Sequence, residues 1–135
     1  MNREPYLARI AAADNEVEGR WAARLTGVDA PYTQATLLAE ALIDEVGDVG
    51  ALQLRTVFMR IEAELARSDG ESRAVLITGL LEDLQTISMN RGVNLDTWTA
   101  WLGPLTRQAW DAVSAVWAGR LAPDKYNEFI RTGRI

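Results

Sequence analysis

The chain has 135 residues, of which 48% are apolar and 24% are charged, a balance that is typical of a folded globular protein. Neither cysteine nor histidine occurs, which excludes disulfides, thiolate or imidazole metal ligands, and Ser-His-Asp or Cys-His catalysis. The net charge of −5 argues against nucleic acid as the main ligand, because nucleic-acid binding needs a basic face. For a chain of this length we expect a single domain over residues 1–135.

The sequence shows no feature of a targeting signal, and we therefore expect a cytoplasmic protein. No apolar run approaches the roughly 18 residues that a membrane-spanning helix needs. The first 21 residues, MNREPYLARIAAADNEVEGRW, contain acidic side chains and no long apolar stretch, so we expect neither a signal peptide nor membrane binding.

Apolar residues recur at helical spacing along the whole chain, with proline and glycine between the periodic segments. No segment alternates at a period of two beside a turn signal, so the fold class is predicted to be all-α. We expect helices over 4–25 (one or two), 34–46, 48–67, 72–90, a short one after Asn94, 104–120, and one that begins at Pro123. In this prediction Thr33 and Asp48 cap helices and Gly47 ends one. The result is a compact bundle of about six or seven helices around a central antiparallel hairpin, formed by the helices over 48–67 and 72–90.

Five tryptophans occur, three of them inside thirteen residues. Trp110 and Trp117 are seven residues apart, which is two helical turns, so we expect both on one buried face. Trp98 and Trp101 lie beside Gly103-Pro104 and are more simply interpreted as core residues. The alternative is an exposed patch that binds a partner or a second copy of the chain, because aromatic residues dominate interface hot spots.

Carboxylates are the main candidates for chemistry or recognition. Glu40, Asp44 and Asp48 are spaced by four residues, with Glu45 beside them. If a helix continued through Gly47, their oxygens would share a face and could hold Mg²⁺. All-α nucleotide pyrophosphohydrolases use helical acidic clusters in this way, but a second matching acidic motif is absent. Arginine outnumbers lysine thirteen to one, and in segments such as RIEAELAR we expect surface ion pairs. Glu62 on that helix is predicted to face solvent.

Three segments between residues 47 and 117 resemble a known family. They are GDVGALQLRTVFMRIEAEL, LITGLLEDLQ and WLGPLTRQAWDAVSAVW. Their combination is similar to small all-helical bacterial proteins that are candidate immunity proteins of polymorphic and contact-dependent toxin systems. The resemblance covers about half of the chain and implies an intracellular binding protein, without enzyme activity and without a cofactor.

These observations predict an immunity protein that binds a cognate basic toxin, possessing no catalytic or metal-binding residue and existing as a monomer or weak homodimer. The predicted partner contacts are Asp44, Glu45, Asp48, Glu82, Asp83, Trp98 and Trp101. An acidic surface would speed association with a basic toxin by electrostatic steering. A helical metal-dependent nucleotide hydrolase and a homodimeric interaction module remain the alternatives.

Overall fold

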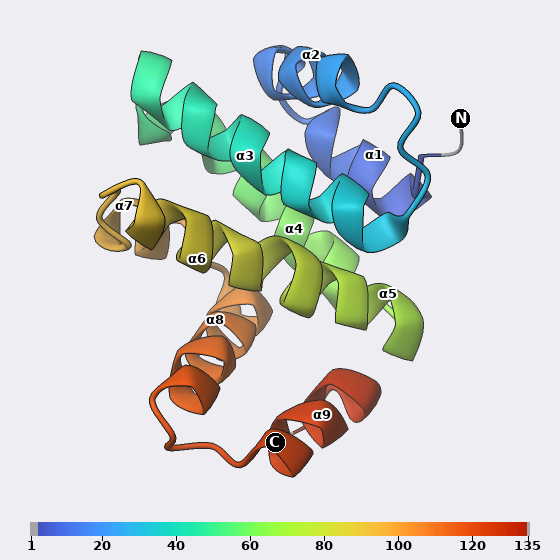
Figure 1. Cartoon of the computed structure of the whole chain (residues 1–135), viewed down its shortest axis with the longest axis vertical. Helices are drawn as coiled ribbons and strands as arrows, with labels where there is room; N and C mark the ends of the chain where they lie inside the picture. Colours follow the sequence, from blue (N-terminus) through green and yellow to red (C-terminus); the bar gives the residue numbers. More distant parts are fainter. Residues whose placement is uncertain (1–2, 135) are drawn as a thin grey trace.

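Helices are the only regular elements in residues 3–134, the part of the chain that the computed structural model describes (Figure 1). This confirms the all-α prediction. The elements are α1 (Pro5–Ala11), α2 (Asn15–Arg24), α3 (Pro31–Val49), the 3₁₀ turn η1 (Ala51–Leu54), α4 (Arg55–Ala66), α5 (Gly70–Ala74), the π-helical η2 (Val75–Leu81), α6 (Glu82–Asn90), α7 (Asp96–Thr99), α8 (Pro104–Trp117) and α9 (Pro123–Thr132). If α5, η2 and α6 are counted as one helix, this part of the chain holds eight helices, close to the six or seven predicted.

Proline begins four of these helices: α1, α3, α8 and α9. The first helical position is favourable for proline because an amide hydrogen there would have no partner within the helix. The predicted ends of α3 are wrong. The helix starts at Pro31, without a cap from Thr33, and it continues through Gly47 to Gly50, where φ is 91°. Asp48 therefore lies inside α3 and caps nothing. One glycine inside a helix costs only about 1 kcal/mol, so Gly47 does not end the helix.

The longest helix runs without interruption from Gly70 to Asn90 as α5, η2 and α6. It lies along α3 in the same direction: the Cβ-less Gly79 faces Tyr32 and Ala35, and further along Arg91 reaches Asp44. A Cβ on Gly79 would lie 2.9 Å from the Cβ of Ala35, so this glycine permits the close approach of the two helices.

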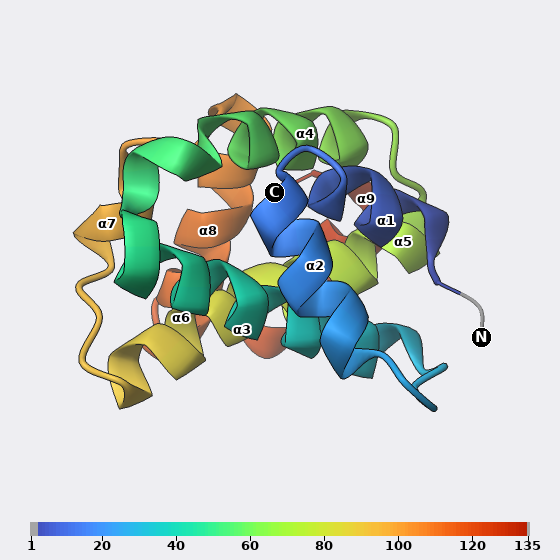
Figure 2. The ribbon, with the colours of Figure 1, turned by 90° about the horizontal axis from the view of Figure 1, so that it is seen from above.

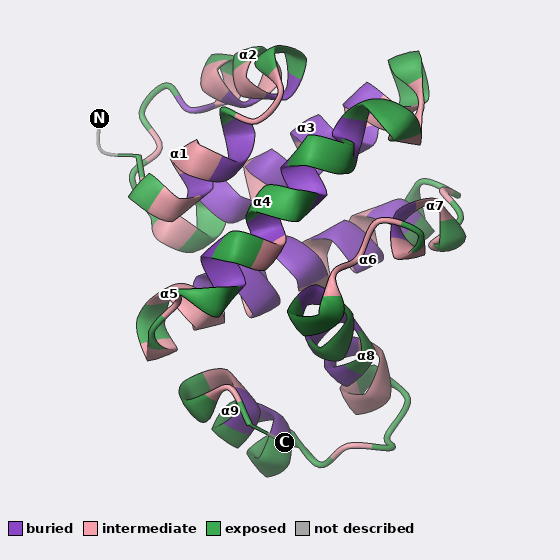
Figure 3. Cartoon of the chain, turned by 180° about the vertical axis from the view of Figure 1, so that it is seen from behind, coloured by how far each residue is buried: buried purple, intermediate pink, exposed green. Residues whose placement is uncertain are grey.

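The central pair of helices differs from the predicted hairpin. The long helix packs mainly on α3, whereas α4 packs on α1 and α8 (Figures 1 and 2). Loop length alone predicted that neighbours in sequence would pair, but the apolar stripe of the long helix fits the small residues of α3 instead. Figure 3 shows that the buried residues gather where α1, α3, α4 and the long helix meet.

Two tryptophans occupy the centre of the core, and the indole N–H group of each is hydrogen-bonded there. Trp21 and Trp98 are both fully buried. The indole Nε1 of Trp21 donates to the carbonyl of Gln34 at 2.9 Å, and that of Trp98 donates to the hydroxyl of Ser88 at 3.0 Å. The Trp98 ring also packs on Phe58, with 5.9 Å between the ring centroids. The core interpretation of Trp98 is therefore confirmed.

The predicted seam of Trp110 and Trp117 is only half right. Trp110 is 3% exposed, but Trp117 is 66% exposed. Two helical turns carry Trp117 about 10 Å along the axis, to the last residue of α8, beyond the helices against which Trp110 packs. Leu105, at the other end of α8, is 40% exposed.

The Leu-Gly-Pro-x-Thr segment forms a cap that is shared between two helices. The Glu62 carboxylate on α4 accepts hydrogen bonds from the backbone amides of Leu105 and Thr106, at 3.0 and 2.8 Å, and from the Thr106 hydroxyl at 2.8 Å. A Cβ on Gly103 would lie 2.5 Å from a Glu62 oxygen. The prediction that Glu62 faces solvent is wrong, because its charge satisfies the free amides at the start of α8.

Candidate functional site

The acidic residues in the second half of α3 are paired with arginines. This arginine-paired cluster comprises Glu40, Asp44, Glu45 and Asp48 with Arg20, Arg24 and Arg91. Arg20 lies 3.0 Å from Glu45 and also contacts Asp48, while Arg24 and Arg91 both contact Asp44, the latter at 3.1 Å. Glu45 is 1% exposed. Because three guanidinium groups offset most of the charge of the four carboxylates, the cluster offers little net negative potential to a partner.

The same cluster gives no support to the metal-site alternative. The helix does continue through Gly47, as that alternative requires, but the carboxylates turn to arginines and not to one another. Within residues 3–134, no group of three or more acidic side chains is placed so that it could hold a metal ion.

Glu82 and Asp83 lie between helices and are half-buried. The Glu82 carboxylate accepts a hydrogen bond from the Tyr126 hydroxyl of α9 at 3.3 Å, and Asp83 accepts one from the Thr36 hydroxyl of α3. Burial raises the pKa of both carboxyl groups, while the hydroxyl donors lower it in part. This pair joins α6 to its two neighbours, and only part of each side chain faces solvent.

Trp98 and Trp101 do not form an exposed patch. Trp98 is fully buried, so its side chain cannot touch a partner while the fold is intact. Trp101 is partly buried and packs against the same core. The exposed tryptophan of this region of the sequence is Trp117, which was assigned to the core.

One cavity lies where the beginnings of three helices meet. It has a volume of about 450 Å³ and is lined by Glu4, Tyr6, Pro31, Tyr32, Asp69, Glu71, Ser72, Ala74 and Val75. We call it the acidic-tyrosine pocket. Glu4 and Tyr6 come from the N-cap and first turn of α1, and Pro31 and Tyr32 from the start of α3. The others come from α5, its N-cap residue and the first residue of η2. π-helical segments such as η2 are frequent at functional sites.

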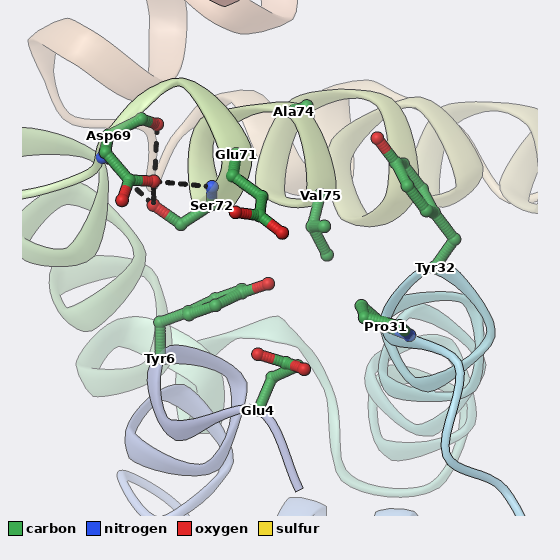
Figure 4. A pocket seen from close by; sticks show the side chains of 9 residues that line it. All are labelled: Glu4, Tyr6, Pro31, Tyr32, Asp69, Glu71, Ser72, Ala74 and Val75. Carbon is green, nitrogen blue, oxygen red and sulfur yellow. Dashed lines mark hydrogen bonds between the residues drawn. The ribbon is translucent and has the colours of Figure 1, made fainter.

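Figure 4 shows that the side chains of Glu4, Tyr6 and Glu71 project into the same space, with Pro31 and Tyr32 on the opposite side. Burial raises the pKa of Tyr6 to about 12, and the negative charges of Glu4 and Glu71 add to this effect. All three side chains line the pocket. Aromatic and acidic surfaces therefore face each other across one cavity.

No basic side chain of residues 3–134 neutralises this pocket. The carboxylates of Glu4 and Glu71 make neither an ion pair nor a hydrogen bond with any described residue, although the Glu4 amide donates to the Gln34 side chain at 2.9 Å. The arginines that are nearest in sequence point elsewhere: Arg3 stacks over the Trp21 ring at 5.5 Å, and Arg73 donates to the carbonyls of Ile130 and Arg131 at 3.0 and 3.1 Å. Among residues 3–134, no ion pair therefore offsets the charge of the Glu4 and Glu71 carboxylates.

Asp69 adds a further fixed negative charge at the rim. Its carboxylate accepts hydrogen bonds from the backbone amide and the hydroxyl of Ser72, at 2.8 and 2.9 Å, and caps α5. These bonds lower the pKa of Asp69. Asp69 is therefore held in place by the fold, whereas no described residue holds the carboxylates of Glu4 and Glu71 in this way.

Sequence reasoning missed this pocket because its residues come from three distant segments. Nothing in the spacing of Glu4, Tyr32 and Glu71 indicates that they meet. The available signals are Pro5 and Pro31, which place both tyrosines in the first turn of a helix, and the Asp69 cap. These signals fix local structure and leave the packing of the three helices open.

Comparisons of the chain with protein-family models, with curated proteins and with solved structures find no match. None of the helices in residues 3–134 combines the length and apolar composition required to cross a membrane. The resemblance to immunity proteins stays a prediction.

Proposed function

We propose that this chain is a binding protein that neutralises a basic partner protein, in the manner of the immunity proteins of bacterial toxin systems. It would act in the cytoplasm, by forming a one-to-one complex that covers the partner's active site or target-binding surface. The observation that supports this proposal most directly is the acidic-tyrosine pocket, an open site with negative charge that the described residues do not balance.

The distribution of charge favours binding of a basic partner at the acidic-tyrosine pocket over binding at the carboxylates of α3. A net charge of −5 attracts a basic protein at long range. At short range, Asp44, Glu45 and Asp48 are already bound to arginines. Glu4 and Glu71 make no ion pair with an arginine of residues 3–134, so they can pair with a cation of the partner without losing such a bond. We therefore transfer the predicted contact surface from the arginine-paired cluster to the pocket.

Affinity capture from the native lysate followed by a neutralisation assay tests the function. We expect a basic protein that binds the purified chain at one-to-one stoichiometry and whose own activity is lost in the complex. Co-expression of the chain should also protect cells from that protein. A captured partner that keeps full activity in a saturated complex would contradict the proposal. The result that no basic protein binds would also contradict it.

The kinetics of that complex test the role of charge. Electrostatic steering mainly sets the association rate, so Glu4→Lys with Glu71→Lys should slow association about tenfold or more at low salt. Glu16→Lys with Glu18→Lys, on α2 outside the pocket, changes the net charge equally and serves as the matched control. Equal slowing by both pairs would show that only the total charge matters.

A further inference from the structure

We propose that the acidic-tyrosine pocket binds one organic cation, an ammonium or guanidinium group on an alkyl stem, which is the side chain of a lysine or arginine of the partner. This inference rests on the proposed function and names the group that the partner inserts. Its first support is the cavity itself, whose volume of about 450 Å³ falls in the range of roughly 300–1,000 Å³ for ligand pockets.

The charge of the lining specifies a cation. Among the described residues 3–134, three carboxylates, Glu4, Asp69 and Glu71, line the pocket, and no lysine or arginine does. Arg73 lies on the same short helix as Glu71, yet its guanidinium turns away to the carbonyls at the end of α9 and to the Ser68 carbonyl at 2.9 Å. A cation from outside would therefore meet negative charge that no arginine of residues 3–134 compensates.

The remaining lining specifies an organic cation with an apolar stem. Tyr6 and Tyr32 supply aromatic surface, and an aromatic face attracts a guanidinium or ammonium group in addition to the carboxylates. Pro31, Ala74 and Val75 supply apolar surface between them. The methylene stem of a lysine or arginine buries such surface while its charged end reaches the carboxylates.

A bare metal ion does not fit this lining as well. A divalent ion needs several oxygens at about 2.0–2.6 Å from one point, and the pocket carboxylates belong to no group of residues 3–134 that could provide this. Asp69 is also committed to the cap of α5. Carboxylates that are spread around a wide cavity suit the larger, delocalised charge of a guanidinium group.

The test is a titration of the isotope-labelled protein with n-butylguanidinium, followed by amide chemical shifts at constant ionic strength. We expect saturable shifts around Tyr6, Tyr32 and Glu71, with a dissociation constant in the millimolar range that is typical of a small fragment. The neutral isostere n-butylurea and Mg²⁺ should each cause at least tenfold weaker effects there. Comparable binding of n-butylurea, saturation by Mg²⁺ or the absence of saturable shifts would overturn the proposal.

Variants locate the binding site. Glu4→Gln with Glu71→Gln should weaken butylguanidinium binding at least tenfold, and Tyr6→Leu about threefold through the lost aromatic face. Glu71→Lys, at an exposed position, introduces an ammonium group and should exclude the probe without disturbing the core. Glu16→Gln with Glu18→Gln is the control and should bind as the parent does. If the first pair binds the probe normally, or if shifts concentrate at the arginine-paired cluster, the proposal is wrong.

The two proposals fail in different ways. If butylguanidinium binds in the pocket but no basic protein is neutralised, the cation site stands and the proposed function falls. If a basic partner is neutralised but its affinity is unaffected by Glu71→Lys, the function stands and the assignment of this pocket is wrong. If Glu71→Lys does weaken the complex, a further experiment identifies the inserted side chain. Each lysine and arginine of the captured partner is replaced in turn. The inserted residue is the one whose replacement abolishes the effect of Glu71→Lys.

Discussion

An acidic region lies beside each end of α3, and the two regions differ in whether arginines pair with their carboxylates. At the C-terminal end, Asp44, Glu45 and Asp48 are held by Arg20, Arg24 and Arg91. At the N-terminal end, Glu4 and Glu71 face a cavity together with two tyrosines and have no ion pair within residues 3–134. The comparison teaches that acidic residues close together in the sequence need not form a binding surface. The positions of the arginines decide which carboxylates stabilise the fold and which remain available.

The largest expected effect concerns a buried carboxylate that an arginine holds. Arg9 on α1 donates twice to Glu64 on α4, at 2.9 and 2.7 Å, and Glu64 is 1% exposed. Arg9→Ala leaves this charge buried without its partner and should reduce the free energy of unfolding by about 3 kcal/mol. Urea denaturation followed by circular dichroism measures the change.

Arg67→Ala is the matched control for this prediction. Arg67 approaches the same carboxylate only to 3.8 Å and is 61% exposed, so we expect a loss below about 1 kcal/mol. Adding Glu64→Gln to Arg9→Ala should restore part of the stability, because it removes the buried charge. Equal losses for the two arginine variants would show that arginine-paired carboxylates do not act as structural elements here.

Two glycine-to-alanine substitutions test how tightly the two ends of α3 are packed. At the pocket end, Gly79→Ala places a Cβ 2.9 Å from Ala35 and 3.4 Å from the Tyr32 ring. Overpacking costs about 1–3 kcal/mol and the better helix propensity of alanine returns up to about 1 kcal/mol, so we expect a net loss of about 1 kcal/mol. At the other end, Gly47→Ala meets nothing within 4 Å and should gain up to about 1 kcal/mol. Thermal unfolding of both variants checks the opposite signs.

The half-buried carboxylates Glu82 and Asp83 belong neither to the arginine-paired cluster nor to the pocket, and the pH dependence of stability tests their role. Burial raises the pKa of Asp83 and Glu82, so the folded chain holds these protons more tightly than the unfolded chain does. Their contribution to stability is complete below the ordinary carboxyl pKa of about 4 and is lost as the pH rises through the raised value. Asp83→Asn, which keeps an acceptor for Thr36, should therefore lose less stability than the parent between pH 4 and pH 7, by less than about 1 kcal/mol.

Urea midpoints at several pH values measure this effect, and Glu18→Gln on α2 controls for the loss of one charge. A parallel pH profile for Asp83→Asn and the parent would contradict the assigned role of burial.

The sequence predicts local structure well because proline, glycine and apolar spacing act over a few residues. Pro104 and Pro123 begin helices as expected, and Asn94 accepts a hydrogen bond from the Asp96 amide, 2.9 Å away, at the start of α7. The exposure of Trp117 and the cap that Glu62 provides depend on where a helix ends relative to its neighbours, which periodicity does not encode. The acidic-tyrosine pocket was unpredictable for the same reason, since three segments create it only when they pack.

The central claim is that the acids at the two ends of α3 have different roles, and a paired unfolding experiment tests it most directly. Asp44→Asn with Asp48→Asn and Glu4→Gln with Glu71→Gln each remove two negative charges, so their effects on net charge cancel in the comparison. At low ionic strength, the account predicts that the first pair loses about 1 kcal/mol, whereas the second stays within about 0.5 kcal/mol of the parent or becomes more stable. A loss by the Glu4 and Glu71 pair that equals or exceeds that of the Asp44 and Asp48 pair would contradict it.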